Sequence, residues 1–137
     1  MADKAFVIAA TMKVDKTFDN KYKTNLPKAM KAAVEAAIKS SSTMTTQKPT
    51  GKGFKTYSLD ATVTSLTQSG NNLEAKLSMV LSEDDHMFGF MNGGAKLQNS
   101  NPKKVDDDVA ELVGDVIDSL IKDKVSKAIQ QQIAKGP

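Results

Sequence analysis

Apolar and polar residues alternate along residues 5–14, and a period of two is typical of a β-strand. One face carries Phe6, Ile8, Ala10, Met12 and Val14, and the other carries Val7, Ala9, Thr11 and Lys13. Both faces are apolar near the start of the segment, so we expect a strand with neighbours on both sides. The run is short and lies between Asp3 and Lys13, which favours a strand over a signal peptide.

A helix is predicted over residues 24–39, because apolar side chains recur there at spacings of three and four. The stripe consists of Leu26, Met30, Ala33, Val34, Ala37 and Ile38. Residues 40–53 follow, with Pro49, Gly51 and Gly53 among Ser, Thr and Gln. This composition predicts a connecting loop.

A β-hairpin is predicted next. Its apolar faces are Tyr57, Leu59, Ala61 and Val63 on one strand, and Leu73, Ala75, Leu77, Met79 and Leu81 on the other. The residues between the strands, 68–72, suit a tight turn. Each strand has one apolar and one polar face, as in an antiparallel sheet that is covered on one side.

The segment 87–94 places two Phe, two Met and three Gly within eight residues. We expect it to begin a third antiparallel strand over residues 87–98, with a bulge or bend at Gly93-Gly94. Simple alternation points Phe88 and Phe90 into the core and leaves Met87 and Met91 on the other face. That other face then meets either water or another subunit.

The last predicted helix runs from about residue 102 to 134. Its stripe begins with Val105, Val109, Leu112, Val113, Val116, Ile117, Leu120 and Ile121, and continues at steps of four with Val125, Ile129 and Ile133. Steps of four drift by about 40° on an α-helix of 3.6 residues per turn. At roughly 50 Å the helix is longer than a ten-residue strand of about 33 Å. Its far end therefore bends over the sheet, or it buries Ile129 and Ile133 in another chain.

The predicted order is β-α-β-β-β-α. This order indicates an α+β fold, a two-layer sandwich with a mostly antiparallel sheet and two helices on one face. A length of 137 residues fits a single domain over 1–137.

Composition excludes several function classes. The chain has no Cys, which excludes disulfides and thiolate metal sites. All nineteen basic residues are Lys, and aromatic residues make up 5% of the chain. A nucleic-acid reader usually relies on Arg and aromatic side chains, so we expect no nucleic-acid partner. No stretch approaches the length of a transmembrane segment. The sequence as written favours the cytoplasm, and an envelope or extracellular location stays open.

Candidate chemistry is sparse. His86 stands beside Glu83, Asp84 and Asp85, but ligands from one turn seldom form a useful metal site. Asp106, Asp107 and Asp108 lack the spacing of a calcium loop and suit the N-terminus of a helix. No nucleophile elbow or base partner accompanies the Ser and Thr residues. We therefore predict no enzyme, no catalytic residue, no metal and no cofactor.

The layout resembles small accessory domains of bacterial envelope proteins. Examples are the amino-terminal domain of TolB and the periplasmic domains of curli-secretion and penicillin-binding-protein-activator lipoproteins. The residues that carry this likeness are the helix Leu26–Ile38, the strand Tyr57–Leu66, the run Gly93-Gly94-Ala95 and the helix Val105–Ile121. The chain has no lipobox Cys, in which it departs from the lipoproteins. The resemblance implies a non-catalytic module that docks partners or assembles into rings or arrays.

The function predicted from the sequence is a non-enzymatic interaction or assembly domain that self-associates. A sheet edge, segment 87–94 and the C-terminal helix are the expected contact regions, because an exposed apolar patch commonly marks an interface. The candidate interface residues are Met87, Phe88, Phe90, Met91, Val125, Ile129 and Ile133. Two alternatives stay open, an envelope accessory domain that binds a peptide or glycan, and a carrier of a small apolar ligand.

Overall fold

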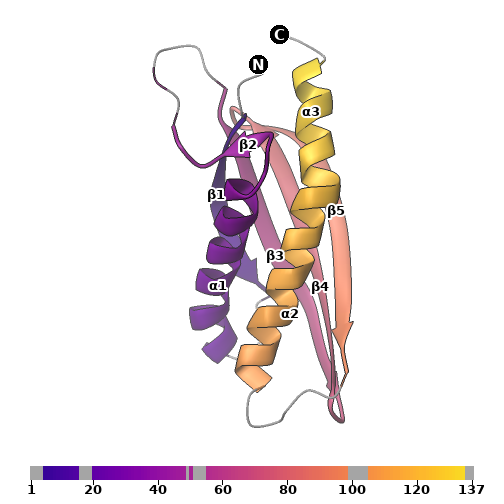
Figure 1. Cartoon of the computed structure of the whole chain (residues 1–137). Coiled ribbons are helices and arrows are strands. Elements are labelled where there is room, and N and C mark those ends of the chain that lie inside the picture. Colours follow the sequence, from indigo (N-terminus) through magenta and orange to yellow (C-terminus); the bar gives the residue numbers. More distant parts are fainter. Residues whose placement is uncertain (1–4, 16–19, 49, 51–54, 99–104, 135–137) are drawn as a thin grey trace.

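The computed structural model describes residues 5–15, 20–48, 50, 55–98 and 105–134 (Figure 1). The elements are β1 (Ala5–Val14), α1 (Asn20–Lys39), β2 (Met44–Thr45), β3 (Tyr57–Ser69), β4 (Asn72–Glu83), β5 (His86–Leu97), α2 (Val105–Leu120), a π-helical turn (Ile121–Val125) and α3 (Ser126–Ala134). Helix α1 begins four residues before the predicted start at residue 24. The predicted start of the last helix, at residue 102, lies outside the described residues.

The five strands form one sheet in the order β2-β1-β3-β4-β5. β3 pairs antiparallel with β4, and β4 pairs antiparallel with β5, as the hairpin patterns predict. β1 is parallel to both of its neighbours, because the chain crosses over through α1 before it reaches β2 and β3. The fold is therefore α+β with a mixed sheet whose longest ladders are antiparallel.

Strand β2 lies in the segment predicted to be a loop, so the loop prediction was wrong for Met44 and Thr45. Met44 is buried in the core, and Thr45 pairs with Phe6 on β1. Two residues are too few to show a period of two, which is why alternation could not reveal this strand. Pro49, Gly51 and Gly53, also assigned to the loop, lie outside the described residues.

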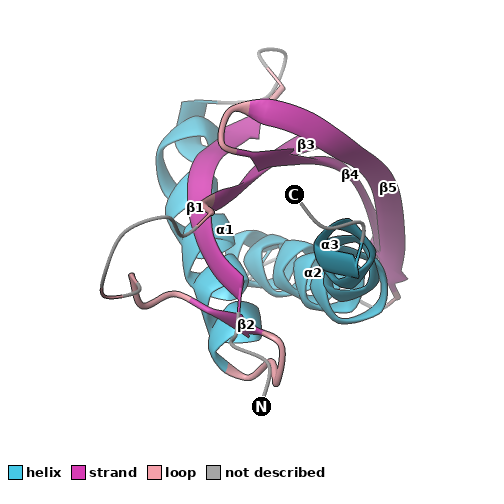
Figure 2. Cartoon of the chain, turned by 90° about the horizontal axis from the view of Figure 1, so that it is seen from above, coloured by secondary structure: helices cyan, strands magenta, loops and turns pink. Residues whose placement is uncertain are grey.

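Both helical segments cover one face of the sheet, as predicted. Figure 2 shows the sheet curling around α2 and α3, with α1 packed between β1 and α2. The inward side chains of β3 and β4 and the apolar stripes of the helices form one buried cluster. Burial of this apolar surface is the main stabilising contribution, at about 25 cal/mol per Å². Polar side chains such as Thr62 and Ser78 lie on the outer face of the same strands.

Helix α2 comes very close to β5 at Gly93. A Cβ atom at Gly93 would lie 2.9 Å from the Leu120 side chain, so any other residue at this position would displace Leu120. The predicted bulge at Gly93-Gly94 was wrong, because β5 pairs with β4 from Gly89 to Leu97 without a shift in register. Gly93 is explained by helix packing instead.

Candidate interaction surface

Strand β5 forms one edge of the sheet, and in the described part of the chain no strand lies beyond it. The Thr64 hydroxyl on β3 donates to the Lys76 carbonyl at 3.2 Å, so that carbonyl of β4 points toward β3. Carbonyl directions alternate along a strand, so the Ala75 carbonyl points toward β5. In agreement, a Cβ atom on Gly94 would lie 3.0 Å from the Ala75 oxygen.

The same alternation assigns the backbone groups of β5. Ala75 faces its ladder partner Ala95, so Ala95 directs its N–H and C=O groups back toward β4. The intervening residues direct theirs to the free edge. These residues are Phe90, Asn92 and Gly94.

The free edge of β5 carries little of the charge that usually protects a sheet edge. Residues 87–95 include no charged side chain. Soluble proteins commonly guard such an edge with Lys, Pro or a bulge, and β5 has a bulge only near its start, between Met87 and Gly89. Here the Lys124 ammonium reaches the edge and donates to the Asn92 carbonyl at 3.4 Å. A carbonyl oxygen has a second lone pair, so Asn92 can still accept a further N–H.

A β-bulge near the start of β5 decides where the side chains of segment 87–94 point. The ladder with β4 skips one residue between Met87 and Gly89, so Phe88 is the additional residue. Phe88 packs against the core, with its ring edge-on to Tyr57 and the two centroids 5.9 Å apart. Aromatic pairs favour this geometry, which stabilises the bulge.

Beyond the bulge, the two faces of β5 are reversed relative to the prediction. Met91 is buried with 9% of its surface exposed, whereas Phe90 is 61% exposed on the outer face. Met87 is 67% exposed, as expected for the other face. The prediction was therefore wrong for Phe90 and Met91, because one inserted residue reverses the alternation for every residue after it.

An apolar patch results on the outer face of the sheet. Val80 on β4 lies directly opposite Phe90, and Met87 lies opposite the next outward residue of β4, Ser82. We call Val80, Met87 and Phe90 the β5 patch. Sequence reasoning missed Val80, although a signal was present. It is the one apolar residue among the outward positions of β4, which are otherwise Glu74, Lys76, Ser78 and Ser82.

A shallow hollow lies beside the β5 patch. It has a volume of about 310 Å³ and is lined by Thr64, Lys76, Leu77, Asn92, Gly93 and Gly94. Gly94 is exposed and has no side chain, so the backbone of β5 is uncovered at this point. An aromatic side chain from a neighbouring strand commonly covers an edge glycine in β-sheets. The hollow is therefore a place where an aromatic ring from a partner fits.

The far end of the last helix packs within its own chain. Val125 and Ile129 are both 0% exposed, so the structure withdraws them from the candidate interface. The physical reason is the π-helical turn, in which the Ser126 N–H bonds to the Ile121 carbonyl, an i→i+5 bond. The additional residue in this turn offsets the drift of the four-residue steps and keeps the stripe on the core. Ile133 is 49% exposed and stays a candidate.

The β4–β5 turn accounts for the acidic residues around His86. Asp84 and Asp85 have φ values of 47° and 73°, the left-handed conformation that two-residue hairpin turns require and Asp tolerates. The Asp84 carboxylate accepts the Thr56 N–H at 3.0 Å, and the Asp84 N–H donates to the Thr56 carbonyl at 2.9 Å. His86 begins β5 and is exposed. These contacts give Asp84 a structural role.

Glu83 connects this turn to the end of α3. The Gln132 amide and the Lys55 ammonium stabilise its carboxylate and lower the pKa of Glu83. The Lys55 Nζ lies 3.0 Å from Glu83 Oε1, and this bond raises the pKa of Lys55. Burial raises the pKa of neighbouring Tyr57. Glu83 is the last residue of β4, so this polar contact links the end of β4 to the end of α3.

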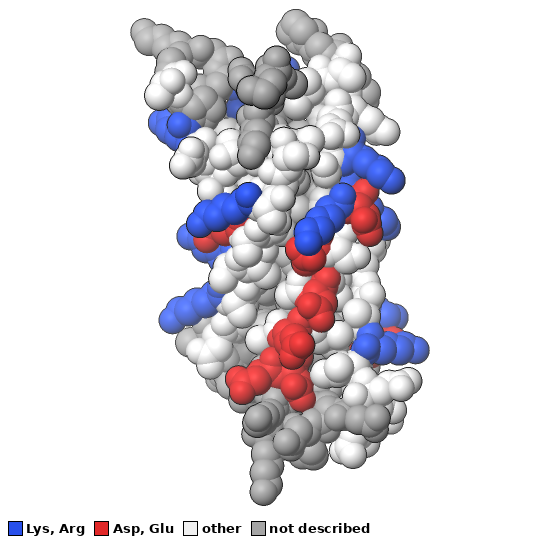
Figure 3. Space-filling model, viewed as in Figure 1, with Lys and Arg blue, Asp and Glu red and all other residues white. Residues whose placement is uncertain are grey.

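Among the residues that the structure describes, no group of His, Asp and Glu side chains is arranged so that it could hold a metal ion. Asp107 and Asp108 lie in the first turn of α2, where the helix dipole favours negative charge, and the side chain of Asp106 lies outside the described part of the structure. Figure 3 shows acidic side chains continuing along α2, over its solvent-facing side. Glu111 and Asp115 extend the row at steps of four.

None of the described helices is both long enough and apolar enough to cross a membrane.

Comparison with known proteins places the chain by fold. No protein-family model and no curated protein matches the sequence. The hypothetical protein CT253 from Chlamydia trachomatis is similar in structure, with a TM-score of 0.67 and 10% identity over 93% of this chain and 98% of that chain. A minor lipoprotein from Acinetobacter baumannii has a TM-score of 0.52 and 9% identity over 89% and 91% of the two chains.

A third structure is a putative neuraminyllactose-binding hemagglutinin homolog from Helicobacter pylori. Its TM-score is 0.53, with 8% identity over 97% of this chain and 89% of that chain. Identities this low show a shared fold alone. The three neighbours are bacterial, and they fit the resemblance to bacterial envelope proteins loosely.

Proposed function

We propose that the chain is a non-enzymatic interaction domain that self-associates through the β5 side of its sheet. The observation that carries the proposal is the free β5 edge, twelve residues long, with two large apolar side chains exposed beside it. Met87 and Phe90 are 67% and 61% exposed, and a solvent-exposed patch next to an unpaired strand edge is a typical docking surface. The exposed Ile133 at the end of α3 can widen the contact.

A second candidate is recognition of another protein or a glycan in a bacterial envelope. Its support comes from the names of two neighbours in fold, a lipoprotein and a putative neuraminyllactose-binding hemagglutinin homolog. The same β5 edge accommodates a peptide strand by β-augmentation. A third candidate, a carrier of a small apolar ligand, has less support. The two hollows described, beside β5 and at the β3–β4 hairpin, are open to solvent, and each has only one large apolar residue in its lining, Leu77 and Leu73 respectively.

Sedimentation velocity over a range of protein concentrations tests self-association. We expect the wild-type chain to sediment faster as its concentration rises. Phe90→Ser should weaken association at least tenfold, because an exposed aromatic at the centre of a patch is a typical hot spot. Ile8→Ser is the matched control. Ile8 is 38% exposed on β1, away from β5, so its loss should leave association unchanged.

Two outcomes would contradict the proposal. A wild-type chain that sediments as a monomer at every concentration overturns self-association and leaves the β5 edge to a strand from another protein. Equal weakening by Phe90→Ser and Ile8→Ser would show that β5 has no special part in the contact.

A further inference from the structure

Building on the proposed function, we propose that two copies join as a closed dimer, with their β5 strands paired antiparallel about a twofold axis at Asn92. The partner at this surface is then a second copy of the same chain. The two sheets become one continuous sheet, and both sets of helices stay on the same face. Three features of β5, and the short strand at the opposite edge of the sheet, lead to this arrangement.

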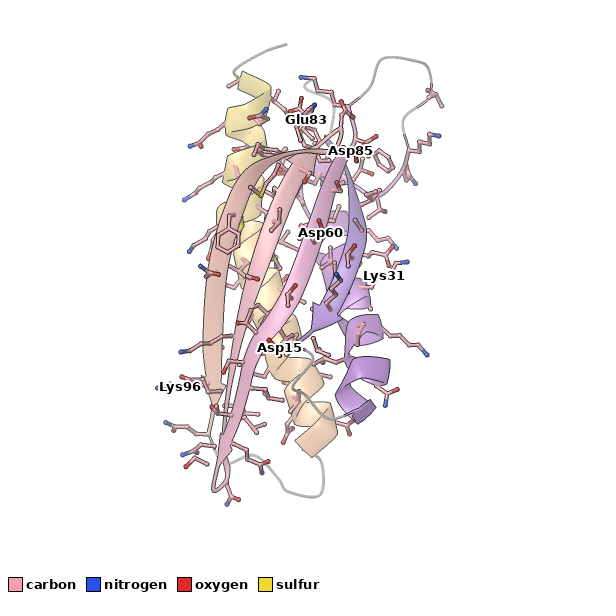
Figure 4. All side chains as sticks on the ribbon, turned by 180° about the vertical axis from the view of Figure 1, so that it is seen from behind. Asp15, Lys31, Asp60, Glu83, Asp85 and Lys96 are labelled. Carbon is pink, nitrogen blue, oxygen red and sulfur yellow. The ribbon has the colours of Figure 1, made fainter. Side chains whose placement is uncertain are left out.

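The charge along β5 selects antiparallel pairing. Glu83, Asp84 and Asp85 lie where β5 begins, and Lys96 lies close to its other end. Figure 4 shows Glu83 and Asp85 at one end of the sheet and Lys96 toward the opposite end. Lys96 also lies 3.5 Å from Glu74, and Glu83 is bonded to Lys55. Antiparallel pairing brings Lys96 of one copy toward the end of the other copy that carries Asp84 and Asp85, whereas parallel pairing would place each of these charges beside its own copy. The stretch 87–95 between them carries no charged side chain of its own, and the cation at this edge is Lys124, whose ammonium donates to the Asn92 carbonyl.

The direction of the backbone groups restricts the register. Phe90, Asn92 and Gly94 present their N–H and C=O groups at the free edge, so these residues must face one another in a paired dimer. Asn92 opposite Asn92 satisfies this condition and also aligns Phe90 with Gly94 of the second copy. Opposed residues then share a face of the sheet, as antiparallel pairing requires.

The hollow at Gly94 favours this register over the other registers in which residues with outward-directed backbone groups face one another. In it, each exposed Phe90 ring lies over the uncovered backbone at Gly94 of the second copy, beside Lys76 and Thr64. The dimer thus contains two such contacts. In each, the exposed Phe90 ring of one copy covers the exposed Gly94 backbone of the other. An aromatic side chain over an edge glycine stabilises a strand pair.

The opposite edge of the sheet explains why assembly stops at two. Strand β2 has only two residues, so it offers a short ladder to a further copy. A twofold contact uses the same surface on both copies and leaves no β5 edge free. Lys124, which meets the Asn92 carbonyl at 3.4 Å, lies on the helix side of the strand and leaves the second lone pair of that oxygen to the partner.

Single cysteines test the geometry, because the natural chain contains none. Asn92→Cys places two sulfur-bearing residues across the axis, with Cα atoms about 5.5 Å apart in a hydrogen-bonded pair, within the range of a disulfide. Mild oxidation should then convert most of the protein to a covalent dimer. Ser78→Cys is the matched control, since Ser78 pairs with Asn92 one strand inward on the same face. Its copies would lie about 14 Å apart, beyond disulfide reach.

The outcomes separate this dimer from the broader proposal. Both variants must first show the thermal unfolding of the wild type. Rapid cross-linking of Asn92→Cys without cross-linking of Ser78→Cys supports the twofold β5 dimer. If the wild type self-associates in the centrifuge but Asn92→Cys cross-links no faster than Ser78→Cys, the dimer geometry is overturned and self-association stands. If the wild type stays monomeric, both proposals fail.

Discussion

In the sequence, segment 87–94 and the end of the last helix are equally suited to an interface. In the structure, segment 87–94 exposes Met87 and Phe90, whereas the end of the helix buries Val125 and Ile129. Both regions are apolar, and both contain one residue more than regular geometry requires. In β5 the additional residue is Phe88, at the bulge. In the helix it is taken up by the π-helical turn Ile121–Val125.

The two insertions have opposite consequences. The bulge in β5 reverses the alternation and moves Phe90 from the core to the surface. The π-helical turn corrects a drift and keeps Val125 and Ile129 in the core of their own chain, which decides between the two alternatives that the sequence left open for Ile129. An insertion thus exposes an apolar side chain in one element and buries two in the other. Local irregularities, more than composition, decide which apolar residues reach solvent.

The largest expected effect concerns the helix end. Ile129→Ala should lower the free energy of unfolding by about 2–5 kcal/mol, because it leaves a cavity at a fully buried site. Ile133→Ala, one step further along the same stripe, is the control and should change it by less than about 0.5 kcal/mol. Urea unfolding of both variants measures the contrast. Equal effects would mean that the helix does not pack on the sheet at Ile129.

A smaller effect is expected in β5, where the contrast lies between adjacent residues. Met91→Ala should lower the free energy of unfolding by about 2 kcal/mol, since Met91 lies in the core. Phe90→Ala should change it by less than about 0.5 kcal/mol, since Phe90 is exposed. Unfolding should be measured at low protein concentration, where self-association adds no stability. A larger loss for Phe90→Ala than for Met91→Ala would restore the simple alternation and remove the bulge.

The long, regular patterns were sufficient to predict most of the fold. The alternation from Tyr57 to Val63 and from Leu73 to Leu81, and the stripe from Val109 to Ile121, all lie on the buried faces that their periods indicate. Each pattern extends over many residues, so one irregular position does not obscure it. The parallel pairing of β1 could not be predicted, because a strand with two apolar faces pairs in either direction. It depends on the crossover through α1.

The candidate site was predictable only in part. Composition was enough to select segment 87–94 and its exposed Met87. The exposure of Phe90 could not be predicted without the register between β4 and β5. That register depends on the pairing of two strands and not on the sequence of one. The same holds for Val80, Asn92 and Gly94, which gain a possible role only when their neighbours are known. Ile133 lies on the same stripe as Ile129 but beyond the core. The length of the helix alone could not show that Ile129 is buried and Ile133 is exposed.

The smallest expected effect concerns Glu83, which links the two contrasted regions. Gln132 on α3 and Lys55 lower the pKa of this carboxyl in the folded chain, so ionisation of Glu83 favours folding. This stabilisation is fully present above the unfolded pKa of about 4.3 and is lost as the pH falls through the lower folded pKa. Glu83→Gln should therefore reduce the Tm at pH 7 by about 1–4 °C, as expected for an ion pair near the surface.

Thermal unfolding at a series of pH values tests this link. The difference in Tm between wild type and Glu83→Gln should stay constant from pH 8 to about pH 5 and then shrink toward zero as Glu83 is protonated in the folded chain. Glu74→Gln removes a carboxylate near the opposite end of the sheet, where Glu74 lies 3.5 Å from Lys96, and is the control for loss of a surface ion pair that does not involve α3. If the difference for Glu83→Gln does not depend on pH, the carboxylate charge does not connect α3 to the β4–β5 turn. The end of the helix would then be held by Ile129 and its apolar neighbours alone, and the two regions would be energetically independent.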